Sequence, residues 1–253
     1  MTTDDLFRLD STVAVVTGAS SGLGAAVARA LAGAGARVAA VARRRDRLAA
    51  LAGEIGGVAL ACDLLDPAGV AGLVPRVVEH LGAPTVLVNA AGGFQHGYRG
   101  EDEPLDVIHR TIELNLVAPF RLCQAVHPHL VAAGGGAIVN VSSISGHVGV
   151  PGIPQASYAA AKAGLSGLTR ELAVQWGRDR IRVNTVAPGF FRSEITASLY
   201  DSERGQAWLQ RGTLLPDEGR AEDVVGAVLW LVSPAGRFTT GQTIVVDGGW
   251  TAR

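Results

Sequence analysis

Short runs of apolar residues alternate with segments of helical periodicity along the whole chain. The first run, TVAVVT at 12–17, is rich in β-branched residues and ends at a glycine, which is typical of a buried strand. Residues 22–34 follow with apolar positions three and four apart, the spacing of an amphipathic helix. The same reasoning predicts further strands at 37–42, 57–62, 85–88, 137–141, 181–186 and 243–246.

Helical patterns fill the intervals between these strands. We expect a bend in the longest of them near Pro119 and Pro128, because proline removes a helix hydrogen bond. Apolar strands that alternate with helices are typical of a parallel sheet covered on both faces, and right-handed crossovers give a doubly wound (Rossmann) α/β fold of about seven strands. No repeat or linker divides the chain, so we expect a single domain over 1–253, with a substrate loop and helix at about 190–220. The predicted helices are 46–53, 67–81, 105–133, 156–178, 194–211 and 221–232.

Composition narrows the functional classes. A formal net charge of −1 argues against broad electrostatic binding of nucleic acid or an acidic membrane. No apolar run approaches the roughly 20 residues that span a bilayer, and the acidic amino end lacks the apolar core of a signal peptide. Cys62 and Cys123 form no CxxC pair, and His127 and His129 have no third ligand nearby, so we expect no metal site and a cytoplasmic protein with reduced thiols.

A glycine-rich turn, TGASSGLG at 17–24, joins the first strand to the first long helix. Such a turn lets backbone N–H groups approach a pyrophosphate, and the helix N-terminus adds a favourable dipole. The spacing departs from GxGxxG, and an ordinary strand-to-helix turn is the alternative interpretation. The predicted cofactor contacts here are Gly18, Ser20, Ser21, Gly22, Leu23 and Gly24.

A tyrosine and a lysine share one face of the predicted helix 156–178. Tyr158 and Lys162 are four residues apart, and this helix follows the fifth strand and the serine-rich turn at 141–146. A solvated helix face is the alternative. However, the carboxyl ends of parallel strands face one crevice, so this pair and the glycine-rich turn should lie at the same site.

Together these motifs resemble those of the short-chain dehydrogenase/reductase superfamily, in its short single-domain branch with 3-oxoacyl reductase-like members. The resemblance covers nearly the whole chain. It also explains the TGxxxGxG form of the glycine-rich turn. The matching motifs are TGASSGLG at 17–24, NAAG at 89–92, Asn115, SS at 142–143, YAAAK at 158–162, APG at 187–189 and TGQTIVVDGG at 240–249.

The resemblance implies a role for each of four residues. Tyr158 would be the general acid/base, and Lys162 would hold the nicotinamide ribose and lower the tyrosine pKa from its usual value near 10. Ser143 would hydrogen-bond the substrate oxygen, and Asn115 would place a water in a proton relay. The loop between Ser143 and Tyr158 is longer than in many relatives, so Ser142 and Ser145 are alternatives to Ser143.

The resemblance also bears on cofactor choice. Relatives that prefer NAD(H) carry an acidic residue at the end of the second strand, where this chain has Ala42 followed by Arg43, Arg44 and Arg45. We therefore expect NADP(H), with Arg43 first and Arg44 second on the 2′-phosphate. NAD(H) and a merely solvated basic face are the alternatives. Further implied cofactor contacts are Asp63, Leu64, Asn89, Ala90, Gly92, Pro188, Gly189, Phe191 and Ser193. For Asp63, a place in a helix N-cap is the alternative interpretation.

The expected substrate is a small carbonyl compound or secondary alcohol. The predicted crevice walls at 94–98, 145–155 and 192–212 are mostly apolar, which favours a ketone, 3-oxoacyl thioester or alicyclic alcohol over a sugar phosphate. A sugar or polyol is a further substrate alternative. A catalytically silent dinucleotide-binding sensor or scaffold, and an epimerase or dehydratase of the extended branch, are the competing functions. Ala- and Leu-rich faces on the helices 105–133 and 156–178 predict a homo-oligomer, a tetramer by the resemblance.

Overall fold

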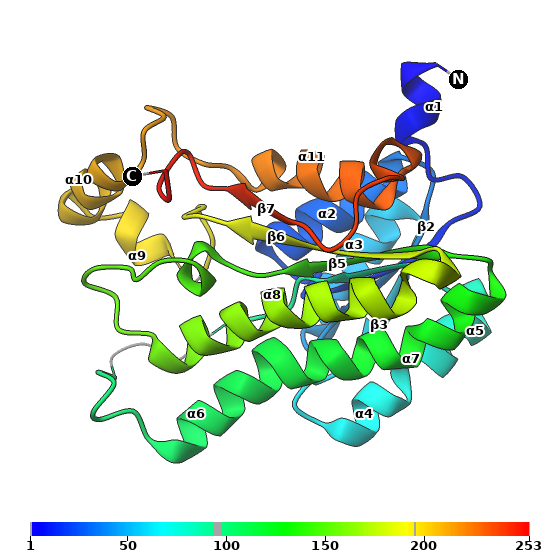
Figure 1. The fold of residues 1–253 in the computed structure, drawn as a ribbon, viewed down its shortest axis with the longest axis horizontal. Helices are drawn as coiled ribbons and strands as arrows, with labels where there is room; N and C mark the ends of the chain where they lie inside the picture. The colour runs from blue at the N-terminus through cyan, green and yellow to red at the C-terminus, as the bar shows by residue number, and fades with distance from the viewer. Residues whose placement is uncertain (1, 94–97, 195, 253) are drawn as a thin grey trace.

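The computed structural model describes residues 2–93, 98–194 and 196–252. Its centre is a sheet of seven parallel strands in the order β3-β2-β1-β4-β5-β6-β7. The doubly wound α/β fold expected from the sequence is thereby confirmed (Figure 1). The strands are β1 (Val13–Thr17), β2 (Arg37–Ala42), β3 (Val58–Ala61), β4 (Val86–Asn89), β5 (Gly136–Val141), β6 (Ile181–Pro188) and β7 (Thr243–Val246).

Helices cover both faces of this sheet, because successive side chains of a strand point in opposite directions. In β1, Ala14 and Val16 pack with α2, α3 and α11, whereas Val13 and Val15 pack with α4, α5, α7 and α8. Figure 1 shows α8 beside the helix formed by α6 and α7. The helices are α1 (Thr3–Phe7), α2 (Gly22–Gly33), α3 (Arg45–Ile55), α4 (Pro67–Ala71), α5 (Leu73–Leu81), α6 (Leu105–Ile112), α7 (Ala118–Ala132), α8 (Ala156–Trp176), α9 (Ala197–Tyr200), α10 (Glu203–Gly212) and α11 (Ala221–Val232).

The strand order reverses at β1, which pairs with β2 on one side and β4 on the other. In open α/β sheets, the chain segments that leave the carboxyl ends of the strands at such a point diverge to opposite faces and leave a crevice. The glycine-rich turn follows β1, and the serine-rich turn follows β5. The topology therefore brings both motifs to the same edge of the sheet.

Two predicted helices are each divided in the structure. The helix expected over 67–81 breaks at Gly72 into α4 and α5. Pro75 lies in the first turn of α5, where its ring would clash with the carbonyl four residues earlier if the helix were continuous. The helix expected over 194–211 is α9 and α10, because Ser202 caps α10 by accepting a hydrogen bond from the N–H of Gly205 (3.2 Å). The short helix α1 was not predicted.

The helix expected over 105–133 contains a π-helical turn, Glu113–Val117, between α6 and α7. Pro119 follows this turn and cannot donate to the carbonyl of Asn115, so the ordinary hydrogen-bond pattern cannot pass through it. Single π-turns inside α-helices are frequent at functional sites. This one holds Asn115, one of the predicted site residues.

A buried polar network connects the middle strands to α8. Asn140 Nδ2 donates to Thr169 Oγ1 (2.9 Å), and Thr185 Oγ1 donates to the same atom (2.8 Å). Asn89 Nδ2 donates to Asn140 Oδ1 (2.9 Å). All four side chains are buried. A buried polar group that loses its partner costs about 1–3 kcal/mol, so the network favours one arrangement of β4, β5, β6 and α8.

In the part of the chain that the structure describes, none of the helices has the length and apolar character that crossing a membrane requires.

Candidate active site

A cleft of about 690 Å³ runs along the carboxyl ends of the strands, from the end of β3 to the end of β6. Most of the residues predicted for the site line it. Asn89 and Asn115 do not: both are buried behind the cleft, and the side chain of Asn89 joins the polar network beneath it. The predicted residues that line the cleft are Gly18, Ser20, Ser21, Gly22, Leu23, Gly24, Arg43, Arg44, Asp63, Leu64, Ala90, Gly92, Ser143, Tyr158, Lys162, Pro188, Gly189, Phe191 and Ser193.

The glycine-rich turn has the geometry of a pyrophosphate cradle. Gly18 and Gly22 have positive φ angles of 70° and 53°, which L side chains rarely adopt. A Cβ on Gly18 would lie 2.8 Å from the backbone of Ala91, and one on Gly24 would lie 2.4 Å from the carbonyl oxygen of Gly18. The turn is therefore closely packed against the end of β4, and the first turn of α2 opens directly onto the cleft. Both features suit an anionic group at a helix N-terminus.

Lys162 lies at the part of the cleft away from the glycine-rich turn and is almost completely buried, with 3% of its surface exposed. Its Nζ donates to the carbonyl oxygen of Val141, at the end of β5 (2.8 Å), and lies 5.5 Å from the centroid of the Tyr158 ring. Burial lowers the pKa of Lys162 to about 7, because a low-dielectric environment disfavours the charged amine. A further negative or polar group at this place would therefore stabilise its ammonium form.

Tyr158 is half-buried and lines the cleft. Burial raises the pKa of Tyr158 to about 12, while its hydrogen bond with Ser143 acts in the opposite direction. We expected Lys162 to lower this pKa, but in the chain by itself burial is the larger effect. The phenol is therefore protonated at neutral pH and can donate a proton. Lowering the pKa of Tyr158 toward neutral pH would require an additional positive charge in the cleft.

The three serines of the serine-rich turn have different surroundings. Ser142 Oγ donates to the carbonyl oxygen of Lys162 (2.9 Å) and is buried, so it attaches β5 to α8. Ser145 Oγ accepts from Gln155 Nε2 (2.9 Å) and from Ser143 Oγ (3.2 Å). Ser143 lies between Ser145 and Tyr158 and lines the cleft. Among the three, its position best suits contact with a substrate oxygen that also meets Tyr158.

Asn115 lies directly behind this group. Its Nδ2 donates to the carbonyl oxygens of Thr111 and Gly93 (2.8 Å each), and its Oδ1 accepts from the N–H of Gly93 (3.1 Å). A Cβ on Gly92 would lie 2.8 Å from Asn115 Oδ1 and 3.1 Å from Lys162 Nζ. Gly92 thus separates two polar side chains without filling the space between them.

At the far end of the cleft, Arg44 extends across the glycine-rich turn. Its guanidinium donates to Ser20 Oγ (2.9 and 3.1 Å) and to Ser21 Oγ (2.5 Å). It also forms an ion pair with Glu194 (2.7 Å), which Arg47 contacts as well. Arg43 is exposed and lines the same end of the cleft. Glu194 lies within the predicted crevice wall at 192–212, but its ion pair with Arg44 was not predicted.

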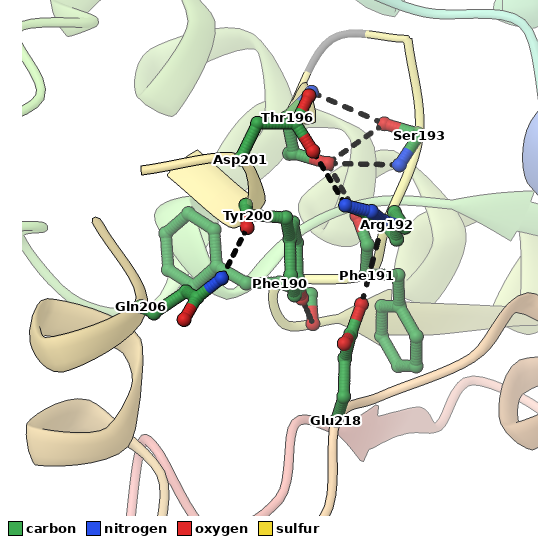
Figure 2. A network of polar contacts seen from close by, with 9 residues as sticks. All are labelled: Phe190, Phe191, Arg192, Ser193, Thr196, Tyr200, Asp201, Gln206 and Glu218. Atoms are coloured by element: carbon green, nitrogen blue, oxygen red, sulfur yellow. Dashed lines mark hydrogen bonds and ion pairs between the residues drawn. The ribbon is translucent and has the colours of Figure 1, made fainter. Parts of the chain in front are cut away.

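The segment after β6 folds onto itself and forms the outer wall of the cleft. Figure 2 shows its polar contacts: Thr196 Oγ1 accepts from the N–H of Ser193 (2.9 Å), and the Tyr200 hydroxyl donates to the carbonyl oxygen of Phe190 (2.9 Å). The Phe190 ring also packs against Trp208 and Trp250, with centroid distances of 5.1 and 4.9 Å. Phe190 and Gln155 line the cleft, and both fall within the predicted substrate loop and crevice wall. Residues 94–97, expected in the substrate wall, lie outside the described residues.

The two cysteines are free and buried. Burial raises the pKa of the Cys62 thiol and raises that of Cys123 to about 12, so neither is an activated thiolate. Among the residues that the structure describes, no three His, Cys, Asp or Glu side chains are grouped so as to hold a metal ion.

The chain is similar to known dehydrogenases and reductases over nearly its whole length. A family model described as enoyl-(acyl carrier protein) reductase matches residues 18–251. D-threitol dehydrogenase of Mycolicibacterium smegmatis is 37% identical over 98% of this chain and 95% of its own length. The 3-oxoacyl-(acyl-carrier-protein) reductase of Escherichia coli is 36% identical over 96% and 98%. The crystal structure of a gluconate 5-dehydrogenase from Burkholderia cenocepacia, in complex with NADP and tartrate, superposes with a TM-score of 0.93 and 33% identity, covering 100% of both chains.

Glu103 is a further residue that the sequence analysis missed. Its carboxylate accepts hydrogen bonds from the backbone N–H (3.2 Å) and the hydroxyl of Ser157, in the first turn of α8. The N-cap residue of this helix, Gln155, makes no capping bond of its own. A carboxylate at a helix N-terminus also interacts favourably with the helix dipole. Glu103 therefore caps the helix that carries Tyr158 and Lys162.

We expect Glu103→Ala to lower the free energy of unfolding by about 1 kcal/mol, the usual effect of a lost cap, and the melting temperature by roughly 2–4 °C. Glu103→Gln should lose less, because its amide oxygen still accepts a hydrogen bond. Glu101→Ala is the matched control, since Glu101 is exposed and pairs only with Arg99 among the described residues. Thermal denaturation followed by circular dichroism gives the comparison. Equal losses for Glu103→Ala and Glu101→Ala would contradict the capping role.

Proposed function

The chain belongs to the short-chain dehydrogenase/reductase superfamily, and from this we propose that it transfers a hydride between NADP(H) and a carbonyl or secondary alcohol. One observation carries the proposal. The cleft has the Tyr158 phenol, Ser143 and the buried Lys162 in one half, and a glycine-rich turn with two arginines in the other. The first group suits proton transfer, and the second suits an anionic dinucleotide.

In the proposed reduction, the carbonyl carbon receives a hydride and the carbonyl oxygen receives a proton. Reduced nicotinamide supplies the hydride when bound. Tyr158 Oη donates the proton, and Ser143 Oγ hydrogen-bonds the same oxygen. Burial keeps the phenol protonated at neutral pH, which suits the acid role. In the reverse direction, Tyr158 must first lose its proton, and the ammonium of Lys162 and a positive charge on the cofactor would both favour this.

The phenol must recover its proton after each reduction. We propose that Lys162 passes this proton in from a water molecule that Asn115 helps to place. Burial already lowers the pKa of Lys162 to about 7, so its amine can both release and accept a proton near neutral pH. Asn115 Oδ1 and Lys162 Nζ both lie beside Gly92, within 2.8 and 3.1 Å of the place that a Cβ on this residue would take.

The cofactor would lie across the switch point of the sheet. Its pyrophosphate would meet the turn at 17–24, and Asp63 and Leu64 would contact the adenine. Ala90, Pro188 and Phe191 would pack near the middle and the nicotinamide. Arg43 would contact the 2′-phosphate first and Arg44 second, because Arg43 is exposed and lines this end of the cleft, whereas Arg44 already contacts Ser20, Ser21 and Glu194.

The substrate would be a ketone, a 3-oxoacyl thioester or an alicyclic alcohol. Ile153, Pro154 and Phe190 give the described part of the wall an apolar character, while Gln155 and Ser145 add polar groups. One relative is named for a 3-oxoacyl substrate on acyl carrier protein, which agrees with the second of these classes. Two others are named for a polyol and a sugar acid, so a polyol is the main competing substrate. A panel of these compounds, assayed with both cofactors by nicotinamide absorbance, would identify the class.

We expect Tyr158→Phe to lower kcat by about 10²–10⁴-fold, the usual contribution of a general acid/base. The phenylalanine ring preserves the packing, so the dissociation constant for NADPH, measured by calorimetry, should stay unchanged. Steady-state assays in both directions give the rate. If the variant retained more than about a tenth of the wild-type kcat, Tyr158 would not be the proton donor.

We expect the wild type to show at least a roughly tenfold higher kcat/KM for NADPH than for NADH, since one charged hydrogen bond contributes about 1.5–3 kcal/mol. Ala42→Asp combined with Arg43→Gln should reverse this preference, because a carboxylate repels the 2′-phosphate and accepts a bond from a 2′-hydroxyl. Arg45→Gln is the control, as Arg45 does not line the cleft. An unchanged ratio in the double variant would reduce the arginine run to a solvated surface.

We also propose a homo-oligomer, with a tetramer as the expected form. Leu105, Phe120, Val131 and Val174 are large apolar side chains exposed on α6, α7 and α8, and Val174 retains 79% of its surface. Exposed apolar patches of this kind are typical of subunit interfaces. Light scattering at micromolar concentration should give a mass above that of one chain, and Val174→Glu should lower it. A monomeric wild type would refute the proposal.

A further inference from the structure

Glu194 brings a carboxylate to the end of the cleft that holds the arginines. Its Oε2 pairs with Arg44 NH1 (2.7 Å), and its Oε1 contacts Arg47. Glu194 follows β6, whereas both arginines lie at the end of β2 and the start of α3, about 150 residues earlier in the chain. The contact therefore joins two elements that meet only across the cleft, and Glu194 and Arg44 both line it.

The carboxylate is charged under ordinary conditions. Hydrogen bonds from Arg47 and Arg44 lower the pKa of Glu194, so it remains ionised at neutral pH. The side chains of Arg44 and Glu194 retain 41% and 51% of their exposure, so a ligand can reach both groups. One negative charge already occupies a guanidinium that a phosphate would otherwise bind.

The backbone beside Glu194 is held in place by local contacts. Ser193 and Thr196 exchange hydrogen bonds: the N–H of Ser193 donates to Thr196 Oγ1 (2.9 Å), and the N–H of Thr196 donates to the carbonyl oxygen of Ser193 (3.2 Å). Figure 2 shows these two residues in the same network as Arg192, which pairs with Asp201. Glu194 thus directly follows a residue whose backbone N–H and carbonyl oxygen are both hydrogen-bonded to Thr196.

We propose that Glu194 limits the preference for the 2′-phosphate, by competing with it for Arg44 and by offering an acceptor to a free 2′-hydroxyl. The last residue of β2 is Ala42, which has no side-chain acceptor for a ribose hydroxyl, and Glu194 supplies a carboxylate to the same end of the cleft from another element. Phosphate and carboxylate repel each other at this range, whereas a hydroxyl can donate to the carboxylate. The proposal rests on the proposed dinucleotide function, but it concerns discrimination between two cofactors rather than catalysis.

The test is Glu194→Gln, which keeps the shape of the side chain and removes its charge. Isothermal calorimetry would measure the binding of 2′,5′-ADP (adenosine 2′,5′-bisphosphate) and of 5′-AMP, which differ only in the 2′-phosphate. We expect the variant to bind 2′,5′-ADP about tenfold more tightly, the equivalent of one charged interaction. Its affinity for 5′-AMP should stay the same or fall. The gain should shrink as salt is added, because the groups are exposed.

Glu54→Gln is the matched control. Glu54 pairs with Arg29 in an exposed ion pair of similar exposure, 50% and 52%, which does not line the cleft. The ratio of its affinity for 2′,5′-ADP to its affinity for 5′-AMP should equal that of the wild type. In an Arg44→Gln background, Glu194→Gln should change the ratio much less, because the shared guanidinium is gone.

An unchanged or lower ratio of affinities in Glu194→Gln would overturn the proposal, as would an equal gain for both ligands, which would indicate a general effect on the turn. These outcomes are separable from failure of the proposed function. A wild type that binds 5′-AMP better than 2′,5′-ADP would refute the NADP(H) preference, yet a higher ratio of the affinity for 2′,5′-ADP to that for 5′-AMP in Glu194→Gln would still support the role of Glu194. Absence of any dehydrogenase activity would leave the binding comparison intact.

Discussion

The buried ammonium of Lys162 is the constraint on which the site depends. A charged or strongly polar group without water must find a partner, and Lys162 Nζ finds the carbonyl oxygen of Val141 at the last residue of β5. Ser142 Oγ returns a bond to the carbonyl oxygen of Lys162, so strand and helix are connected in both directions. A Cβ on Gly146 would lie 2.8 Å from the backbone of α8, so the serine-rich turn and this helix are in close contact. Tyr158, one helical turn earlier, is positioned as a result.

The two halves of the cleft obey different electrostatics. Around Lys162 and Asn115 the groups are buried, so each hydrogen bond is strong and each misplaced charge is costly. Around Arg44 and Glu194 the groups are exposed, so their interactions are screened and readily exchanged for others. A reacting centre benefits from fixed geometry, whereas recognition of a phosphate can tolerate adjustment. In the proposed function the fold would provide both, because the first half lies between β5 and α8 and the second at the open end of β2.

Local patterns in the sequence predicted the elements, and contacts between distant segments decided the rest. All seven strands were predicted because each is a continuous apolar run, and Tyr158 and Lys162 were found because four-residue spacing has a fixed meaning on a helix. The π-turn at Asn115 has no comparable signature beyond Pro119. Glu103 and Glu194 act on partners 54 and about 150 residues away, so nothing near either residue marks its role. The split at Gly72 was readable from Pro75 and was overlooked.

The aromatic contact between Phe190, Trp208 and Trp250 gives the molecule a built-in optical reporter. Trp208 and Trp250 are two of the four tryptophans, their ring centroids are 4.7 Å apart, and Phe190 joins them to the wall of the cleft. Trp176 packs instead on His127 at the other end of α8, and the Trp230 indole donates to the carbonyl oxygen of Ala235. Two of the four indoles therefore lie beside the wall of the cleft. Any ligand that displaces Phe190 should alter this emission, so occupancy can be followed in the unlabelled protein.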